Sequence, residues 1–163
     1  MGKIAASLAV LLVLVGCGKK QETPSTAGIG AVDNAKIAAC ANNLKQLLKM
    51  QYNYMVQYGG TQKMMPRETG GAFWLKLSKS PTVLIDSSLQ SIYACPFKAP
   101  RPGATDYRGP ASDVNRMQGG DPVGACIGNH PDGSAVIMRK SGDIQTVKEG
   151  DSLYQKALET TKP

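Results

Sequence analysis

Between residues 33 and 60, apolar side chains recur at steps of three and four, which is the spacing of one face of an α-helix. Asp33 or Asn34 can cap the first turn, and Gly59-Gly60 can close the last one. A helix of this length with a single apolar stripe needs a sheet or a second helix to cover it. The positions of the stripe are Ile37, Cys40, Ala41, Leu44, Leu48, Met55 and Tyr58.

After this helix the apolar pattern shortens, and its second half is typical of strands. Residues 73–77 predict a short second helix that ends before Pro81, with Trp74 as a core anchor. Two β-rich runs, 135–139 and 144–147, flank the glycine-bearing turn 140–143 and predict a hairpin. Further strands are expected at 106–109, ending at Pro110, and at 122–127, and the segment 91–96 also reads as leading into sheet.

Residues 151–158 predict a short, capped terminal helix, after which the last residues should fray. The predicted fold class is therefore α+β, with a long N-terminal helix packed on a small antiparallel sheet and a short C-terminal helix.

The N-terminus has the pattern of an export signal. An apolar run from Ile4 to Val15 follows Met1-Gly2-Lys3, and its length of about 12 residues is short of the roughly 20 that span a bilayer. It closes on Leu14-Val15-Gly16-Cys17, which resembles the lipobox of bacterial lipoproteins. The resemblance implies cleavage before Cys17, a diacylglycerol thioether on its sulfur and an acylated new N-terminus. The alternative is an ordinary signal peptide with an incidental cysteine.

Three regions follow from these patterns: a signal peptide at 1–16, the lipidated Cys17 with a polar tether at 17–32, and a globular domain at 33–163. We expect the domain to be anchored to a membrane outside the cytoplasm. Gly18 stands where an aspartate would retain a lipoprotein in the inner membrane, so the outer membrane is favoured in a cell that has two. The net charge of +7 is spread along the chain without a basic stripe, which argues against a nucleic-acid partner.

Three cysteines remain once Cys17 is lipidated, and an oxidising compartment favours one disulfide and one thiol. Cys95–Cys126 is the first choice, because both residues flank segments that read as sheet. Cys40 lies on the apolar face of the long helix, where a buried free thiol is common. Cys40–Cys95 and Cys40–Cys126 stay open as alternatives.

Residues for catalysis are few. His130 is the only histidine, so no Ser-His-Asp set can be argued, and we expect no enzymatic activity. Cys126 and His130 stand four residues apart and, with Cys95, could supply three zinc ligands. No second close ligand pair supports such a site, so the disulfide is preferred and no metal or cofactor is expected.

The aspartates of the predicted sheet loops offer oxygen ligands for calcium, but their spacing is not that of a calcium loop. Solvated turn carboxylates are the simpler interpretation. The residues concerned are Asp106, Asp113, Asp121, Asp132 and Asp143.

Several motifs resemble those of type II secretion pseudopilin-like proteins, in particular the type-G group and its relatives. They occur in the family's order over residues 33–150: Cys40-Ala41-Asn42-Asn43-Leu44-Lys45-Gln46, Cys95-Pro96, Asp106-Tyr107-Arg108-Gly109, Asn129-His130 and Ser141-Gly142-Asp143. The resemblance implies a pilin-like head, with an N-terminal helix laid across a small antiparallel sheet. In this chain a lipobox and a polar tether replace the long apolar helix that pseudopilins insert in the membrane and pack in their filament.

The expected function is therefore that of a lipid-anchored, non-enzymatic head for protein–protein contact, linked to secretion-system or envelope proteins. Two alternatives stay open: an extracytoplasmic module that binds calcium or a small ligand through the aspartate-bearing loops, and a thiol-active enzyme.

Overall fold

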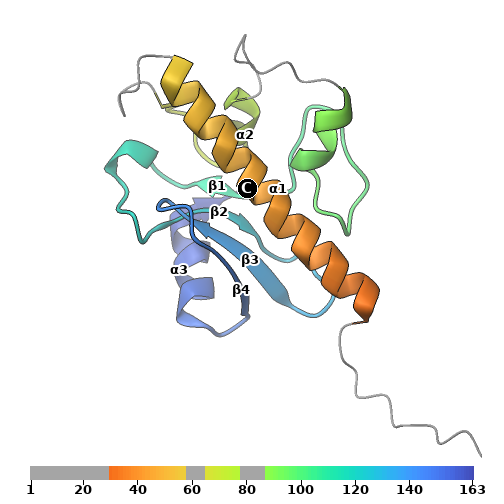
Figure 1. The fold of residues 1–163 in the computed structure, drawn as a ribbon. Coiled ribbons are helices and arrows are strands. Elements are labelled where there is room, and N and C mark those ends of the chain that lie inside the picture. The colour runs from red at the N-terminus through yellow and green to blue at the C-terminus, as the bar shows by residue number, and fades with distance from the viewer. Residues whose placement is uncertain (1–29, 58–64, 78–86) are drawn as a thin grey trace, which may run out of the picture.

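The computed structural model describes residues 30–57, 65–77 and 87–163, and it has the predicted α+β architecture (Figure 1). The helices are α1 (Ala31–Gln57), α2 (Gly71–Leu77) and α3 (Ser152–Thr160), with 3-10 helices η2 (Ser87–Tyr93) and η3 (Val114–Arg116). The strands are β1 (Gly109–Pro110), β2 (Pro122–Cys126), β3 (Ser134–Arg139), β4 (Ile144–Lys148) and β5 (Thr161–Lys162). No helix among these residues is long and apolar enough to cross a membrane.

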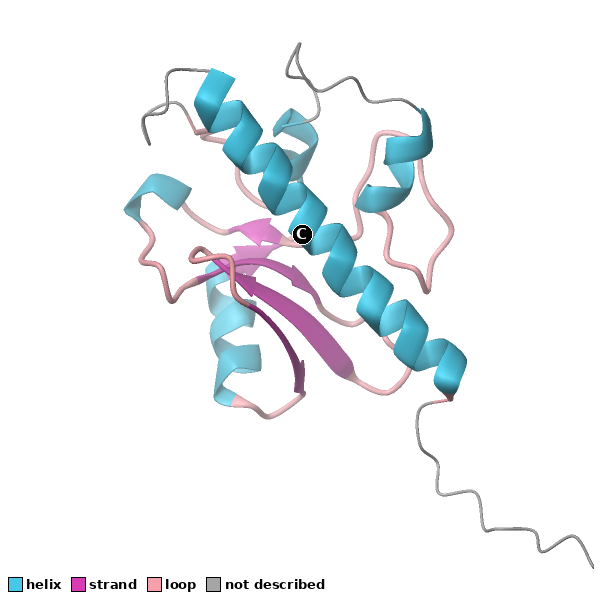
Figure 2. Cartoon of the chain, in the orientation of Figure 1, coloured by secondary structure: helices cyan, strands magenta, loops and turns pink. Residues whose placement is uncertain are grey.

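The antiparallel meander β2-β3-β4 is the middle of three layers. α1 crosses one face of this sheet and α3 covers the other (Figure 2). Strand β3 shows why both faces are covered, because successive side chains of a strand point to opposite sides. Val136 and Met138 pack into the core under α1, whereas Ala135 and Ile137 pack against α3. β3 is consequently buried along nearly its whole length.

α1 begins earlier than the sequence predicts. Its first residue is Ala31, and the carbonyl oxygen of Gly30 accepts hydrogen bonds from the amides of Asp33 and Asn34. Asp33 therefore lies inside the first turn, where its charge favours the positive end of the helix dipole, and neither predicted cap residue is the cap. The predicted end at Gly59-Gly60 lies outside the described residues, as does Tyr58 of the predicted stripe.

Two segments differ from the predicted strands. The residues before Cys95 form the 3-10 helix η2 and not a strand, so the argument that placed Cys95 beside sheet was wrong. The strand expected at 106–109 is reduced to a bridge between Arg108 and Ala125, followed by β1. Helix α2 begins at Gly71, two residues before the predicted start, and Trp74 is fully buried as expected.

The C-terminus does not fray. After α3 the chain forms β5, which pairs antiparallel with β1. Arg108 holds this end of the chain, because its guanidinium group donates to Thr161 Oγ1 (3.0 Å) and to the carbonyl oxygens of Leu158 and Thr161. The carbonyl groups at the end of a helix lack hydrogen-bond donors within the helix, and Arg108 supplies a donor to one of them, that of Leu158. Thr161 is consequently almost completely buried.

α1 and α2 approach the sheet closely at Gly124 in β2. A Cβ atom placed there would lie 2.8 Å from the Trp74 ring, 3.1 Å from Met138 and 3.4 Å from Leu44. Trp74 cannot move away easily, because its Nε1 donates to the carbonyl oxygen of Arg108 at 3.0 Å and its ring meets Phe73 edge-on. The absence of a side chain at Gly124 lets the helices rest on the sheet.

Replacing Gly124 by alanine should therefore lower the free energy of unfolding by about 1–3 kcal/mol, the usual cost of overpacking a core. Urea unfolding followed by circular dichroism measures this change. Gly119→Ala is the matched control, because only the Cβ of Ser141 lies within 4 Å of the added atom, and it should have little effect. Equal stability of the two variants would contradict the packing described here.

Candidate functional site

The chemically reactive side chains of the described residues meet at one place, between α1 and the sheet. Their ligand atoms, three sulfurs and one ring nitrogen, all lie within 4.8 Å of one another. The three cysteines are fully buried and the histidine is 6% exposed. We name this group the Cys–His cluster; it consists of Cys40, Cys95, Cys126 and His130.

Each member comes from a different part of the chain. Cys40 lies on the buried face of α1, Cys95 follows η2, Cys126 is the last residue of β2, and His130 stands in the loop before β3. In the sequence, Cys95 lies 55 positions after Cys40, and Cys126 lies 31 positions after Cys95. The cluster therefore joins the helix layer to the sheet.

Polar contacts from α1 hold the segment that contains Cys95. The side-chain amide of Asn43 donates to the carbonyl oxygen of Ala94 at 3.1 Å, and it also contacts the Tyr107 hydroxyl at 3.1 Å. Tyr107 in turn donates to the Ala94 oxygen at 3.1 Å. Burial is the main cause of the raised pKa of Tyr107, so its hydroxyl stays protonated and remains a donor. These contacts fix the position of Cys95 relative to the axis of α1.

Asp106 fixes Cys95 from the other side. Its Oδ2 accepts the backbone N–H of Cys95 at 3.1 Å, and its own N–H donates to the Tyr93 oxygen at 2.9 Å. Its second carboxylate oxygen pairs with Arg101 at 2.8 Å. The chain then turns tightly, because the N–H of Lys98 donates to the Cys95 oxygen at 2.7 Å. Cys95 is thus held by backbone as well as by side-chain contacts.

A hydrogen-bond chain orients His130. The hydroxyl of Ser134 donates to Asp132 Oδ1 at 2.7 Å, and the same hydroxyl oxygen lies 3.0 Å from His130 Nδ1. Because the hydroxyl hydrogen points to Asp132, the hydroxyl oxygen accepts a hydrogen bond from the N–H group at Nδ1. The neutral ring then carries its hydrogen on Nδ1 and a lone pair on Nε2. Nε2 is buried and has no hydrogen-bond partner.

The three sulfurs differ in their affinity for protons. Hydrogen bonds from Cys126 and Cys40 lower the pKa of Cys95, and the nearby His130 lowers it further. Contact with Cys126 raises the pKa of Cys40, followed by contact with Cys95 and burial. A contact with Cys40 lowers the pKa of Cys126, but Cys95 and burial outweigh it and raise this pKa to about 12.

Aromatic and aliphatic groups cover the cluster on its outer side. The centroid of the Phe97 ring lies 5.1 Å from that of the His130 ring. The ammonium group of Lys36, in α1, lies over the same Phe97 ring, 5.1 Å from its centroid. Such a cation over an aromatic face is attracted by the ring's quadrupole. The arrangement closes the site between α1 and the loop that follows Cys95.

Two chemistries fit such a group of side chains: a disulfide between two of the sulfurs, or a four-coordinate metal ion. The structure brings the predicted pair Cys95 and Cys126 together, but it holds all three cysteines as free thiols. The pairing of these cysteines thus stays a prediction. The sequence argument missed that Cys40 joins Cys126 and His130, since a ligand on a distant helix has no spacing signal. The one indication in the sequence was the position of Cys40 on the apolar stripe of the long helix, which predicts that its side chain faces the sheet.

The predicted calcium ligands do not come together in the same way. The carboxylates of Asp113, Asp121, Asp132 and Asp143 each accept a hydrogen bond from a residue two or three positions away. That of Asp106 accepts from Arg101 and from the backbone N–H of Cys95. Within the described ranges, the Cys–His cluster is the group of His, Cys, Asp and Glu residues that could hold a metal ion. The aspartates are explained by local turn structure.

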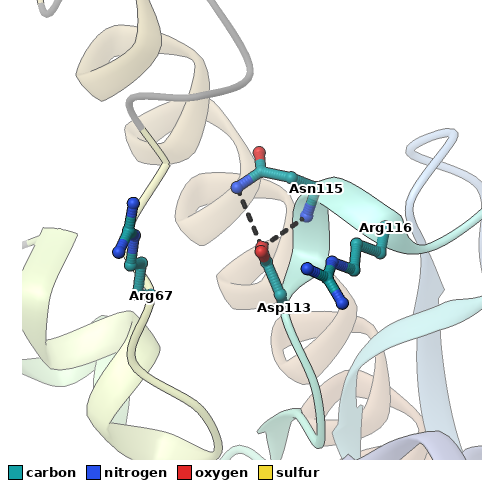
Figure 3. A pocket seen from close by; sticks show the side chains of 4 residues that line it. All are labelled: Arg67, Asp113, Asn115 and Arg116. Atoms are coloured by element: carbon teal, nitrogen blue, oxygen red, sulfur yellow. Dashed lines mark hydrogen bonds between the residues drawn. The ribbon is translucent and has the colours of Figure 1, made fainter.

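A second hollow, of about 660 Å³, lies between the segment before α2 and η3 (Figure 3). Arg67 faces it from one side, and Asp113, Asn115 and Arg116 line the other. The carboxylate of Asp113 is occupied, because it accepts both the backbone and the side-chain N–H groups of Asn115. Both arginines are exposed, whereas the Cys–His cluster is buried, so the cluster is the stronger candidate site.

Comparisons with protein-family models, with curated proteins and with solved structures give no match. The site is therefore interpreted from its own geometry.

The hydrogen-bond chain behind His130 gives a pH dependence. Burial alone would raise the pKa of Asp132, but hydrogen bonds from Lys148 and Ser134 outweigh it and lower this pKa well below its usual range. A carboxylate with a lowered folded-state pKa stabilises the fold above its unfolded pKa, and this stability is lost as the pH falls toward the folded value. Asp132→Asn should therefore cost about 1.5–3 kcal/mol at pH 7, the usual net value of a hydrogen bond to a charged group.

This cost should shrink once the pH falls below about 4, the usual carboxyl pKa. Urea unfolding of both proteins between pH 3 and 7 gives the comparison. Asp143→Asn serves as the control, because Asp143 is partnered by a neighbouring serine and by no lysine. A cost for Asp132→Asn that does not vary with pH would rule out the charge as its cause.

Proposed function

We propose that this chain is a membrane-anchored lipoprotein whose pseudopilin-like head serves protein–protein contact in type II secretion or envelope assembly. The head is non-enzymatic. One observation carries the proposal: the only imidazole and the three cysteines of the head are buried, while apolar side chains are exposed on α1. A long helix laid across a small antiparallel sheet is also the architecture that the pseudopilin resemblance implies.

The exposed apolar side chains give the head a surface for a protein partner. Tyr52 is 49% exposed and Val56 is 77% exposed. Residues four positions apart lie on the same face of a helix, so these two side chains form one patch on the second half of α1. Next to them is a cavity of about 170 Å³, lined in part by Tyr52, Met55 and Met65. Aromatic and methionine side chains are enriched in protein interfaces.

The patch lies far from the end of the head that follows the tether. α1 begins at Ala31, and Val56 stands 25 residues further on, which at 1.5 Å per residue is about 37 Å along the helix. With the lipid on Cys17, this arrangement would hold one end of α1 near the membrane and present Tyr52 and Val56 at the other end. A partner in the envelope could then be reached without the filament-forming helix of a pseudopilin.

The alternatives have less support. A calcium or small-ligand module would use the aspartates, whose carboxylates are occupied by local partners. A thiol-active enzyme needs an accessible thiolate, and Cys95 is completely buried.

Replacing Cys17 by serine should move the protein from the membrane to the soluble fraction of the cell, because serine cannot form the thioether. Fractionation and immunoblotting measure the distribution, and mass spectrometry of the native chain should show Cys17 as the first residue, with a diacylglycerol thioether on its sulfur and an acylated amino group. Native protein found in the soluble fraction, or a chain with unmodified Cys17, would overturn the anchored-lipoprotein proposal.

The contact surface can be tested with the double variant Tyr52→Ser, Val56→Ser. Secretion-system or envelope components should co-purify with the native protein from detergent-solubilised membranes, and at least tenfold less with the double variant. Leu158→Ser is the matched control, because Leu158 is an apolar residue on α3 that is 40% exposed. Equal recovery from the double variant and the control would exclude this patch as the contact surface.

A further inference from the structure

We propose that the Cys–His cluster binds one Zn²⁺ ion in a closed, four-coordinate structural site, through three thiolate sulfurs and Nε2 of His130. This inference does not depend on the anchor or the partner, and it goes beyond the interaction function of the head. It replaces the expectation of an isolated disulfide with a site that uses all four side chains.

The spacing of the ligand atoms fits a single ion. Four ligand atoms that all lie within 4.8 Å of one another are close enough to bind the same ion. With Zn–S bonds of about 2.3 Å, the edge of a tetrahedral zinc site measures about 3.8 Å. Closing the widest pair of the cluster to this length requires a shift of about 1 Å, which side-chain rotation can supply. A disulfide would draw two sulfurs together and leave the third sulfur and the imidazole unused.

The imidazole is oriented as a metal ligand. Zinc-bound histidines usually donate the hydrogen of the second ring nitrogen to a carboxylate, a carbonyl or a similar acceptor, which fixes the tautomer. Here Nδ1 donates to Ser134, and Ser134 donates to Asp132. The lone pair of Nε2 is left buried without a hydrogen-bond partner, and His130 as a whole is only 6% exposed. An unpaired buried acceptor is costly, and a metal ion would satisfy it.

Hydrogen bonds to the sulfurs are of the kind that stabilises bound thiolates. The side-chain amide of Asn129 donates to Cys126 Sγ at 3.2 Å, and the same amide contacts the Asp106 oxygen at 3.2 Å. A donor of this kind offsets part of the negative charge on a thiolate sulfur, and it fixes the position of that sulfur.

The charge balance also favours a cation. Zn²⁺ displaces the protons that remain on the thiols and leaves three thiolates, a neutral imidazole and the ion, with a net charge of −1. No electron is transferred in this step. Three thiolates whose sulfurs lie this close together repel one another unless a cation lies between them. Sulfur and imidazole ligands in a tetrahedral set select zinc over calcium or magnesium, and four protein ligands leave no position open for a substrate.

The test uses the full-length lipoprotein, extracted from membranes in detergent without chelator and without added metal. Elemental analysis should give one zinc per chain. Denaturation in the presence of an alkylating agent and a chelator, without reductant, should label all three cysteines of the head. Exchange of zinc for Co²⁺ should give the intense visible bands of tetrahedral cobalt and the near-ultraviolet bands of thiolate-to-cobalt charge transfer.

Variants identify the ligands. Cys40→Ser and His130→Ala should each lose stoichiometric zinc, whereas Cys17→Ser, whose substitution lies outside the cluster, should keep it. Ser134→Ala keeps all four ligands and removes the hydroxyl that accepts the Nδ1 hydrogen and donates to Asp132. It should raise the zinc dissociation constant 10–100-fold in a chelator competition, as loss of such a supporting contact typically does. Ser141→Ala, at the other end of β3, is its control and should have no effect.

A chain that carries a disulfide among these cysteines and no stoichiometric metal would overturn the proposal, as would zinc that dialysis removes. Full zinc content in both ligand variants would overturn the assignment. If Cys40→Ser fails to fold, the native zinc content, the thiol count and Ser134→Ala still decide. Membrane fractionation and partner recovery are separate measurements, so failure of the zinc site can be told apart from failure of the proposed function.

Discussion

The contact between α1 and the sheet β2-β3 is the constraint on which the rest of the structure depends. Cys40, Leu44 and Leu47 form its buried stripe, at the three- and four-residue steps of one helix face. On the other side, the absence of a side chain at Gly124 leaves room for Trp74 and Leu44. Each residue of a helix is rotated by 100° from the one before, so a shift of one position would turn this stripe away from the sheet.

The same contact fixes the polar groups that a purely apolar interface would leave undetermined. Apolar packing is tolerant of small displacements, whereas hydrogen bonds are directional. Asn43 follows the buried stripe by one turn from Cys40, and its amide reaches the loop that contains Ala94. The position of α1 therefore sets the position of Cys95 relative to Cys40. Helix packing and the assembly of the Cys–His cluster are two consequences of one register.

Local patterns predicted the elements, and non-local contacts account for what was missed. The long helix, the hairpin of β3 and β4 and the helix α3 follow from periodicity and turn residues within each segment. β5 exists because Arg108 and β1, some fifty residues earlier, supply hydrogen-bond partners that no local pattern can show. The segment before Cys95 has β-favouring residues but no strand beside it to pair with, and it forms η2. The site was half predicted: Cys95 and Cys126 were paired, and His130 was placed near them. For Cys40, the sequence favours a buried free thiol and leaves pairing with Cys95 or Cys126 open, because its neighbours in space lie far away in sequence.

Compartment and geometry lead to different expectations for the same cysteines, and the geometry accounts for more of the structure. An oxidising compartment explains why two thiols would pair, but it gives no role to the third sulfur, to the lone pair of His130 or to the serine and aspartate behind the ring. A bound ion gives each of these groups a partner, and coordinated thiolates are protected from pairing. It also ties α1 to β2, so the helix that carries Tyr52 and Val56 on its outer face is fixed from within. In this view the buried chemistry of the head sets the rigidity of the surface that a partner would meet.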